Sequence, residues 1–364
     1  MSVLRKYSGV FIDDGLGLKA AARFKKRRDK LAKQIGHLTL IFGVEEGPGG
    51  QNPWALIPSF MYQEPLMLHL TGINQLNTAI LLDPERNEEL LFLPEKDPHK
   101  EFWDGTSLGV GTSQAEADAQ TLTGFHSLHP ISDLSSILIA KLKEKKRNPA
   151  LGLYWLESEE HKKVTEDSNY YYKVAMVDTL KETKLSKIPV INIADQQWDQ
   201  RFKLDDQDIK NVKKAVSVTT NAFKSTISNL SAYKSEQEVS GKLNGEINQN
   251  SYFLNSFPSI IAGGKNATIL HYMKNNDPLK KGSLLLMDFG ARWQCMCADI
   301  SRTVPVNGKF SPLQKLLYNI VLDTQKYVES LVSPKKSIED LNNACWPYMK
   351  DLLKDRKSTR LNSS

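Results

Sequence analysis

Two neighbouring segments decide the fold, Leu284-Leu285-Leu286-Met287-Asp288-Phe289-Gly290 and Ala298-Asp299-Ile300-Ser301-Arg302-Thr303. Each is an apolar run that carries one carboxylate, and Asp299 lies eleven residues after Asp288. If the segments form a hairpin that turns at Trp293-Gln294, the two aspartates stand directly opposite one another. Opposed side chains on one face of such a pair have Cβ atoms about 4.5–5.5 Å apart. The spacing therefore predicts two carboxylates that meet across adjacent strands.

Two carboxylates at this distance could hold a pair of cations roughly 3.5–4 Å apart. Oxygen ligands are hard donors, which suit Mn²⁺, Mg²⁺ or Co²⁺, with Zn²⁺ also compatible. Without a cation, two buried acids so close together would repel and their pKa values would rise. The alternative is structural: Asp288 ends a strand at a turn, and Asp299 pairs with Arg302. Spacing alone slightly favours this alternative, because Asp is common at strand ends and no Asn-Gly turn sets the register.

Three further residues lie close to this pair in the sequence. His271 belongs to the alternating run 267–273, which predicts a strand, and by itself it fits a satisfied core histidine better than a catalyst. Cys295 and Cys297 share strand parity with Asp299 and would face the same way. We expect both cysteines to be small buried residues, because thiolates are misplaced in an all-oxygen site.

The distribution of apolar runs predicts two domains. Strands that alternate with helices indicate an α/β layer domain at residues 20–190; its strands are expected at 38–44, 67–73, 79–82, 90–93 and 151–156, and its helices at 21–34, 134–145 and 158–181. The basic run in 21–34 predicts a solvated helix face. A second unit begins near Trp198, spans 198–354 and has an α+β order. Its helices are expected at 205–228, 236–248 (opened by a capping box, Ser235 to Glu238), 311–331 and 338–354, and its strands at 259–262, 267–273, 283–288 and 295–304.

Composition limits the class of protein. The chain has 364 residues, of which 40% are hydrophobic and 25% charged, the balance of a soluble globular protein rather than of a collagen or a disordered chain. Lys plus Arg number 48 and Asp plus Glu 42, a net charge of +6, which does not argue for nucleic acid. The three cysteines, an odd and low number, fit a reducing compartment. With no signal peptide and no membrane-length apolar run, we expect a cytoplasmic protein.

The last ten residues, 355–364, break the helical spacing of apolar positions that precedes them in 338–354. They resemble the translation of a widely used sequencing-library adapter, and we expect them to be a scar that is excluded from the fold. We therefore also expect the natural C-terminus to be missing.

Several motifs together resemble one family. The run from Phe257 to Tyr272 (FPSIIAGGKNATILHY) and the run from Lys281 to Gly290 (KGSLLLMDFG) resemble the active-site approach of aminopeptidase P. Asp299 to Phe310 (DISRTVPVNGKF) continues the match. Near the N-terminus, 70–74 (LTGIN) and 101–105 (EFWDG) resemble weaker signatures of the same family. The chain thus resembles the Xaa-Pro aminopeptidases of the creatinase/prolidase, or pita-bread, superfamily.

This resemblance implies a fold and a site. The fold is an α/β N-terminal creatinase-like domain followed by an incomplete α+β pita-bread domain. The family holds two divalent metal ions, usually Mn²⁺, with two Asp, one His and two Glu. Asp288 and Asp299 match the two Asp ligands, with Asp299 bridging the ions, and His271 matches a substrate-contacting catalytic histidine. Trp103 aligns with a tryptophan that reaches the substrate site of a neighbouring subunit, which implies a homo-oligomer.

The implied activity is release of the N-terminal residue from peptides with proline at the second position by a metal-activated water. The remaining ligands, His, Glu and Glu, would lie beyond Ser364, so we expect the chain alone to be inactive, to bind metal weakly and to expose an apolar face. The family often has a Gly-Tyr-x-Gly segment where Cys295-Met296-Cys297-Ala298 stands. Two alternatives stay open: a non-catalytic interaction protein of the same fold, and a prolidase that acts on Xaa-Pro dipeptides. No nucleic-acid or membrane partner is expected.

Overall fold

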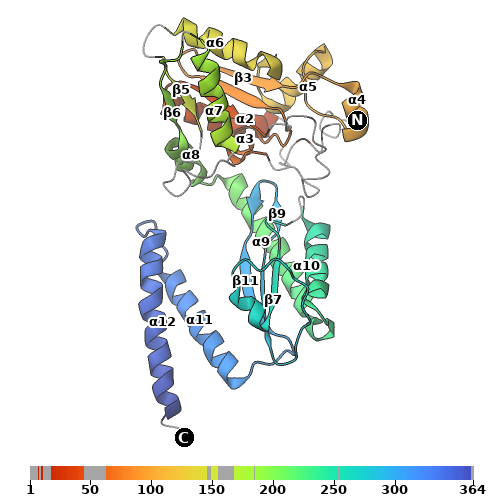
Figure 1. Cartoon of the computed structure of the whole chain (residues 1–364), viewed down its shortest axis with the longest axis vertical. Coiled ribbons are helices and arrows are strands. Elements are labelled where there is room, and N and C mark those ends of the chain that lie inside the picture. Colours follow the sequence, from red (N-terminus) through yellow and green to blue (C-terminus); the bar gives the residue numbers. More distant parts are fainter. Residues whose placement is uncertain are drawn as a thin grey trace. The chain divides into compact units, whose positions relative to one another are not determined.

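The computed structural model describes residues 7, 10, 18–44, 63–145, 149–154, 168–183, 185–251 and 255–361, without the side chains of 18–19, 104, 168–174 and 356–361. Its helices are α2 Leu18–Ile35, α3 Pro65–Thr71, α4 Pro98–Asp104, α5 Ser113–Thr123, α6 Leu134–Glu144, α7 Ser168–Lys181, α8 Ala194–Arg201, α9 Asp206–Ile227, α10 Glu236–Asn250, α11 Pro312–Leu331 and α12 Ile338–Leu361 (Figure 1). The first part of the helix expected at 158–181 lies outside the described residues. Within them, no helix combines the length and apolar character that crossing a membrane requires.

The chain divides into two units. One comprises Met1–Lys214 with Trp293–Met296, and the other Ala215–Arg292 with Cys297–Ser364. The division falls inside α9, so a single helix contributes to both units.

The first unit is built on a six-stranded sheet of order β4-β3-β2-β1-β5-β6. The strands are β1 Leu38–Phe42, β2 Ala79–Asp83, β3 Glu88–Leu93, β4 Ser127–Pro130, β5 Leu151–Leu153 and β6 Val190–Asn192. Strands β1, β2 and β3 pair antiparallel, whereas β4, β5 and β6 join parallel to their neighbours. This mixed pattern places an antiparallel meander in the middle of the sheet.

Helices cover both faces of this sheet, as the alternation of strand side chains requires. Residues of α2, α3 and α5 pack with Ile41, Ile80 and Leu91 on one face. Residues of α6 and α7 pack with Leu40 and Leu81 on the other (Figure 1). The domain is therefore a three-layer sandwich, and its α/β class agrees with the sequence-based prediction.

One predicted strand of this unit is wrong. Residues 67–73 lie mostly in helix α3, where the Glu64 carboxylate accepts a hydrogen bond from Met67 N at 2.7 Å and Pro65 occupies the first turn. Gly72 ends the helix at φ +70°, a left-handed value that favours glycine. Because α3 is buried on nearly all sides, its sequence is mostly apolar, with only His69 and Thr71 as exceptions, and it looks like a buried strand.

The basic face predicted for α2 is not solvated throughout. Arg28 is fully buried, where it donates to both carboxylate oxygens of Glu89 at 2.8 and 2.9 Å and lies over the ring of Phe125. Arg27, also buried, donates to Asp208. Paired guanidiniums are the charges that proteins bury most readily, so this part of the run anchors α2.

The second unit contains a three-stranded antiparallel sheet of order β11-β8-β7. Its strands are β7 Ile260–Gly263, β8 Leu284–Phe289 and β11 Ile300–Pro305, and the short pair β9 Arg292–Trp293 and β10 Met296–Cys297 lies between β8 and β11 in sequence. Helices α9 and α10 cover one face, where Phe289 stacks on Phe223 with ring centroids 5.6 Å apart. Helices α11 and α12 pack on each other, with Tyr327 stacked on Tyr348. Helix α12 continues to Leu361, beyond the expected end at Lys354.

Candidate metal centre

Strand β8 separates an apolar face from a face that carries Asp288. Leu285, Met287 and Phe289 are buried, whereas Asp288 is only half-buried, as are Leu284 and Leu286. Thr219 of α9 fixes the end of the strand, because its hydroxyl accepts a hydrogen bond from Ala291 N at 2.8 Å. The helices thus hold one face of β8 and leave the carboxylate on the other.

The predicted register between the two carboxylates is wrong by two residues. Asp288 pairs with Ser301, not with Asp299. The hairpin turns one residue later than expected, at Gln294-Cys295, and Gln294 adopts φ +56° there. A slip of two residues preserves the side-chain face, because strand side chains alternate with a period of two. Asp299 therefore lies diagonal to Asp288 on the same face.

The two carboxyl groups nevertheless interact. The pKa of Asp299 is raised, first by partial burial and then by the negative charge of Asp288 and a hydrogen bond between the two carboxyls. Ser301 Oγ donates to Asp288 Oδ1 at 2.7 Å, which holds that carboxyl from the partner strand. Across the described residues no ion pair joins Arg302 to Asp299, and the Arg302 guanidinium donates to the Ser301 carbonyl instead. The structural alternative, in which Arg302 neutralises Asp299, is therefore not found.

A close backbone approach connects the two aspartates. A Cβ atom at Gly290 would lie 1.7 Å from the carbonyl oxygen of Ala298, so only glycine fits between them. Ser256 braces the same point, with its Oγ 2.8 Å from the Ala291 oxygen and 2.7 Å from the Ala298 oxygen. Because Ala298 immediately precedes Asp299, this contact sets the position of the second carboxylate.

His271 lies on a loop, so the strand predicted at 267–273 is wrong. After β7 the chain forms the 3-10 helix η5, Gly264–Thr268, and then a turn that contains the exposed His271. The next residue, Tyr272, packs with Ile260 and Ala262 of β7 and with Leu286 of β8. Ile260 is the strand partner of Asp288, so the loop covers the carboxylate face of the sheet. Within the described part of the chain, no hydrogen bond joins His271 to either aspartate.

The two cysteines of the hairpin are not both buried, which corrects the expectation. Cys297 is exposed and Cys295 is half-buried, and both are free, as is Cys345. Burial raises the pKa of the Cys295 thiol. At neutral pH a raised pKa keeps the thiol protonated, and a protonated thiol is a poor metal ligand.

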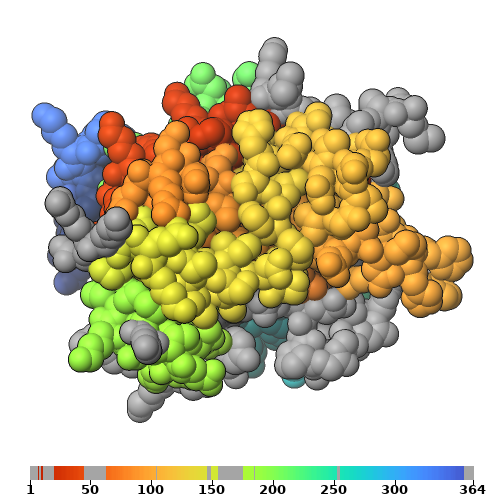
Figure 2. Space-filling view, turned by 90° about the horizontal axis from the view of Figure 1, so that it is seen from above, coloured from red at the N-terminus to blue at the C-terminus, as the bar shows by residue number. Residues whose placement is uncertain are grey.

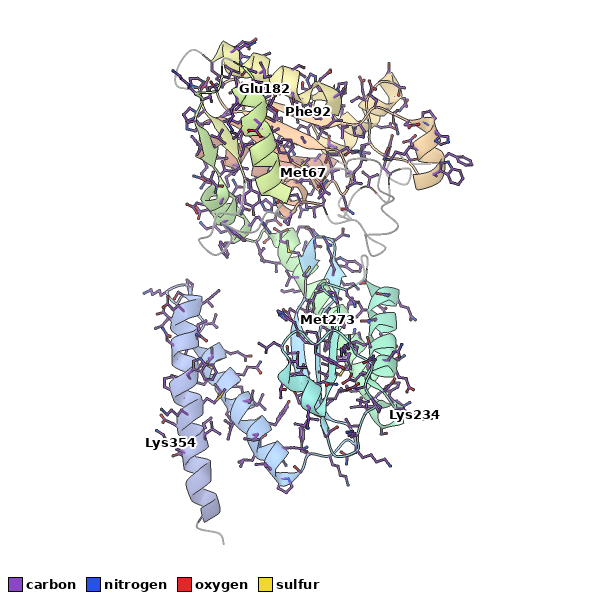
Figure 3. All side chains as sticks on the ribbon, in the orientation of Figure 1. Met67, Phe92, Glu182, Lys234, Met273 and Lys354 are labelled. Atoms are coloured by element: carbon purple, nitrogen blue, oxygen red, sulfur yellow. The ribbon has the colours of Figure 1, made fainter. Side chains whose placement is uncertain are left out.

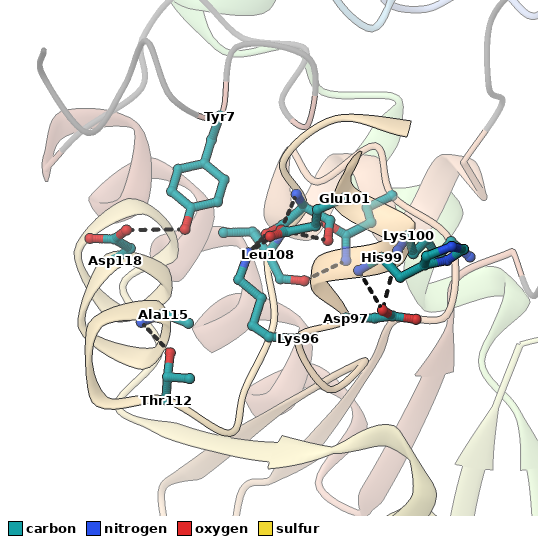
Figure 4. A network of polar contacts seen from close by, with 12 residues as sticks. Tyr7, Lys96, Asp97, His99, Lys100, Glu101, Leu108, Thr112, Ala115 and Asp118 are labelled. Atoms are coloured by element: carbon teal, nitrogen blue, oxygen red, sulfur yellow. Dashed lines mark hydrogen bonds and ion pairs between the residues drawn. The ribbon is translucent and has the colours of Figure 1, made fainter. Parts of the chain in front are cut away.

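Trp103 belongs to the first unit. It lies on α4 with 70% of its surface exposed, edge-on to Phe102, which is 79% exposed. Figure 2 shows the orange-yellow segment that contains α4 projecting from the edge of the surface. Asp97 caps the start of α4, and from the middle of the helix the Glu101 carboxylate contacts Lys96 and accepts a hydrogen bond from Ser107 N at 2.9 Å (Figure 4). This network fixes the helix that presents the aromatic pair.

Asp288 and Asp299 fit part of a metal-ligand set. They supply hard oxygen donors from one face, and partial burial together with the nearby Asp288 charge raises the pKa of Asp299. Among the described residues, no group of three or more His, Cys, Asp or Glu side chains could hold a metal ion. The described residues thus provide two carboxylates rather than a complete coordination sphere.

Sequence reasoning missed Glu236, Tyr272 and Ser301. The capping box at Ser235 is confirmed only in part: Ser235 caps α10, but the Glu238 carboxylate accepts from Lys234 N rather than from Ser235. The adjacent Glu236 is fully buried beneath the His271 loop. A buried glutamate in the first turn of a helix resembles an ordinary exposed one in sequence, because Glu is common at that position.

Comparisons with known proteins agree with this architecture. The chain is 28% identical to Xaa-Pro aminopeptidase 3 of Mus musculus over 84% of its length, and to Xaa-Pro aminopeptidase of Haemophilus influenzae over 88%. It spans 58% of the mouse protein and 69% of the bacterial one. The structure matches Zn-substituted E. coli aminopeptidase P in complex with product with a TM-score of 0.76 and 24% identity, covering 92% of this chain and 73% of that chain.

Two family models match successive parts of the sequence. Residues 24–150 match the aminopeptidase P N-terminal domain, and residues 210–359 match metallopeptidase family M24. The order of the two matches confirms the predicted fold class, an α/β N-terminal domain followed by part of a pita-bread domain. The chain is therefore similar to the aminopeptidase P N-terminal domain in its first part and to metallopeptidase family M24 in its second part.

Proposed function

We propose that the protein to which this chain belongs is a metalloaminopeptidase that hydrolyses the N-terminal Xaa-Pro peptide bond. The observation that carries the proposal is the pair of interacting carboxyls, Asp288 and Asp299, on one face of the β8–β11 hairpin. The match of residues 210–359 to metallopeptidase family M24 supports a metal-dependent hydrolase. Relatives that are themselves named Xaa-Pro aminopeptidases support the choice of substrate.

Each residue has a defined part in this proposal. Asp288 and Asp299 would hold divalent cations, for which we propose Mn²⁺, and Ser301 would orient the Asp288 carboxylate through its hydrogen bond. The bound cations supply a nucleophilic water at neutral pH and polarise the scissile carbonyl. His271, exposed on the loop that covers the same face, would donate a hydrogen bond to the substrate and orient it. Trp103 would reach the substrate site of a second subunit, which makes the enzyme a homo-oligomer.

We further propose that these 364 residues do not cleave peptides on their own. The described residues offer two clustered carboxylates and no third ligand beside them, whereas Mn²⁺ requires a fuller set of oxygen or nitrogen donors. The free cysteines support a reducing compartment, and we propose a cytoplasmic location. Fractionation of cells that express the full-length protein tests that location.

The experiment uses full-length enzyme loaded with Mn²⁺ and a peptide that has proline at the second position. We expect hydrolysis, and we expect Asp299→Ala to lower kcat/KM at least a hundredfold, because the variant loses one of the two carboxylates that would hold the cations. Asp351→Ala is the matched control, since Asp351 is an exposed acid of α12 whose ion pair with Lys354 is also exposed. Retention of full activity by Asp299→Ala would refute the proposal.

The same assay separates the alternatives. Cleavage of Xaa-Pro dipeptides but not of longer peptides would identify a prolidase. No cleavage at any peptide length, with metal bound, would favour a non-catalytic interaction protein.

A further inference from the structure

Glu236 is a buried carboxylate with no role in the site described so far. It is the first residue of α10 and its side chain is fully buried. Four donors fill its two oxygens. Oε1 accepts from Gly263 N at 2.7 Å and from the Asn266 amide at 2.9 Å, and Oε2 accepts from the Tyr272 hydroxyl at 2.8 Å and from Asp277 N at 2.9 Å. Such a complete set of donors offsets the cost of burying a carboxylate.

The four donors come from the start, the middle and the end of one loop. Gly263 ends β7, Asn266 lies in η5, Tyr272 follows His271, and Asp277 closes the loop. The Asn266 amide lies 3.0 Å from the Tyr272 hydroxyl, so the bound groups also contact each other. The Glu236 carboxylate thus links both ends and the middle of the loop 263–277 through hydrogen bonds.

One side of the loop is buried and hydrogen-bonded to Glu236, and the other side is exposed to solvent. Tyr272 is buried, and burial together with the hydrogen bond to Glu236 raises its pKa to about 12, so it stays a donor at neutral pH. Its neighbours toward solvent are exposed: Ile269 by 54%, Leu270 by 89% and Met273, labelled in Figure 3, by 53%. His271 is exposed among them. The position of His271 therefore depends on anchors below the loop.

We propose that Glu236 is a positioning residue that holds His271 over the Asp288 face by anchoring Tyr272. Tyr272 belongs to the apolar cluster against which Leu286 packs, and Leu286 lies two residues before Asp288 on β8, so the anchor holds the loop on the Asp288 face of the sheet. Glu236 itself touches neither substrate nor metal in this arrangement. The role assigned to His271 rests on the proposed function.

Glu236→Gln tests the anchor with almost no change of shape. Each carboxylate oxygen faces one backbone N–H, from Gly263 or from Asp277. Whichever oxygen becomes an amide nitrogen, a backbone N–H then faces another N–H donor, and that pair cannot form a hydrogen bond. Tyr272→Phe is the second variant, because it keeps the ring in the apolar cluster with Ile260 and Ala262 and removes only the hydroxyl.

The first measurement is hydrogen exchange on this chain. We expect amides of residues 264–276 to exchange at least tenfold faster in Glu236→Gln, and somewhat less so in Tyr272→Phe, while amides of α9 and β8 keep their rates. We also expect the NMR signals of the His271 imidazole to shift. Glu246→Gln is the matched control, since Glu246 lies on the same helix and contacts Ser225 and Lys242 rather than the loop. Unchanged exchange in both test variants would overturn the proposal.

The second measurement is kinetic and uses Mn²⁺-loaded full-length enzyme. We expect Glu236→Gln and His271→Ala each to lower kcat at least tenfold with metal content unchanged, and the double variant to be no slower than His271→Ala alone. Independent, multiplying losses in the double variant would overturn the positioning role. Full activity of Asp299→Ala would instead overturn the proposed function, so the two failures are distinguishable. If Glu236→Gln does not fold, Tyr272→Phe carries both measurements.

Discussion

Gly290 offers the sharpest test of how the hairpin sets the two carboxylates. We expect Gly290→Ala to destabilise the β8–β11 hairpin and to displace Asp299. The added Cβ atom would lie 1.7 Å from the Ala298 oxygen, so the two atoms must separate by a further 1.3 Å to reach even 3.0 Å. Neither partner is a flexible side chain, so the backbone itself has to move.

The hydrogen bonds at this point set the magnitude. Ala298 N donates to the Ala291 oxygen at 3.0 Å, and Ser256 N donates to the Gly290 oxygen at 2.8 Å. Ser256 Oγ also contacts the Ala298 oxygen at 2.7 Å. Loss of two such bonds costs about 2 kcal/mol, and a polar group left buried without a partner raises the total to about 3–4 kcal/mol.

Urea unfolding followed by circular dichroism measures the change, and hydrogen exchange of β8 and β11 amides localises it. Gly245→Ala is the matched control, because Gly245 lies inside α10 with open space around its Cα. Alanine has the higher helix propensity, so we expect this control to stabilise the protein by about 0.5–1 kcal/mol. The reasoning is refuted if Gly290→Ala unfolds within about 0.5 kcal/mol of the wild type, the scatter of ordinary surface substitutions.

Two further predictions concern His69 and Ser301. Burial, and next the Arg27 and Arg201 guanidiniums, lower the pKa of His69 to about 3, below its unfolded value of about 6.5. The histidine's contribution to stability is therefore complete above pH 6.5 and is lost as the pH falls toward 3. Between pH 7 and pH 5 the free energy of unfolding of the wild type should fall by about 2 kcal/mol more than that of His69→Asn, measured by urea unfolding. Ser301→Ala removes the donor to Asp288 Oδ1 and should lower the Mn²⁺ affinity of full-length enzyme about tenfold, measured by titration calorimetry, with the unfolding free energy changed by less than about 1 kcal/mol.

Each of these predictions has a contrary outcome. Parallel pH profiles for the wild type and His69→Asn would show that His69 titrates normally in the folded protein. Unchanged metal affinity in Ser301→Ala would show that the hydroxyl does not orient the Asp288 carboxylate.

The features that sequence predicts correctly are those with a strong local cause. Alternation in β8 places Leu285 and Met287 on one face and Asp288 on the other, and parity alone brings Asp299 to the same face. Helices with clear periodicity and caps, such as α11 with its capping box at Ser311, also follow from local interactions.

The errors arise where the tertiary environment competes with the local pattern. Helix α3 lacks a polar face because it is buried almost all round, so periodicity cannot distinguish it from a strand. The turn at Gln294 carries no glycine signal, which is why the register is off by two. The loop around His271 alternates like a strand, yet it curls because one buried carboxylate, Glu236, collects donors from both of its ends.

The chain by itself thus determined which residue types are available for metal chemistry and on which strand face they lie, because side-chain parity depends only on position along the backbone. Tertiary structure alone decided which atoms meet: the diagonal placement of Asp299, its contact with Asp288, and the anchoring of the His271 loop. These depend on turn geometry, on the glycine-only approach of Gly290 to Ala298, and on a buried glutamate whose partners lie 27 to 41 residues away in sequence.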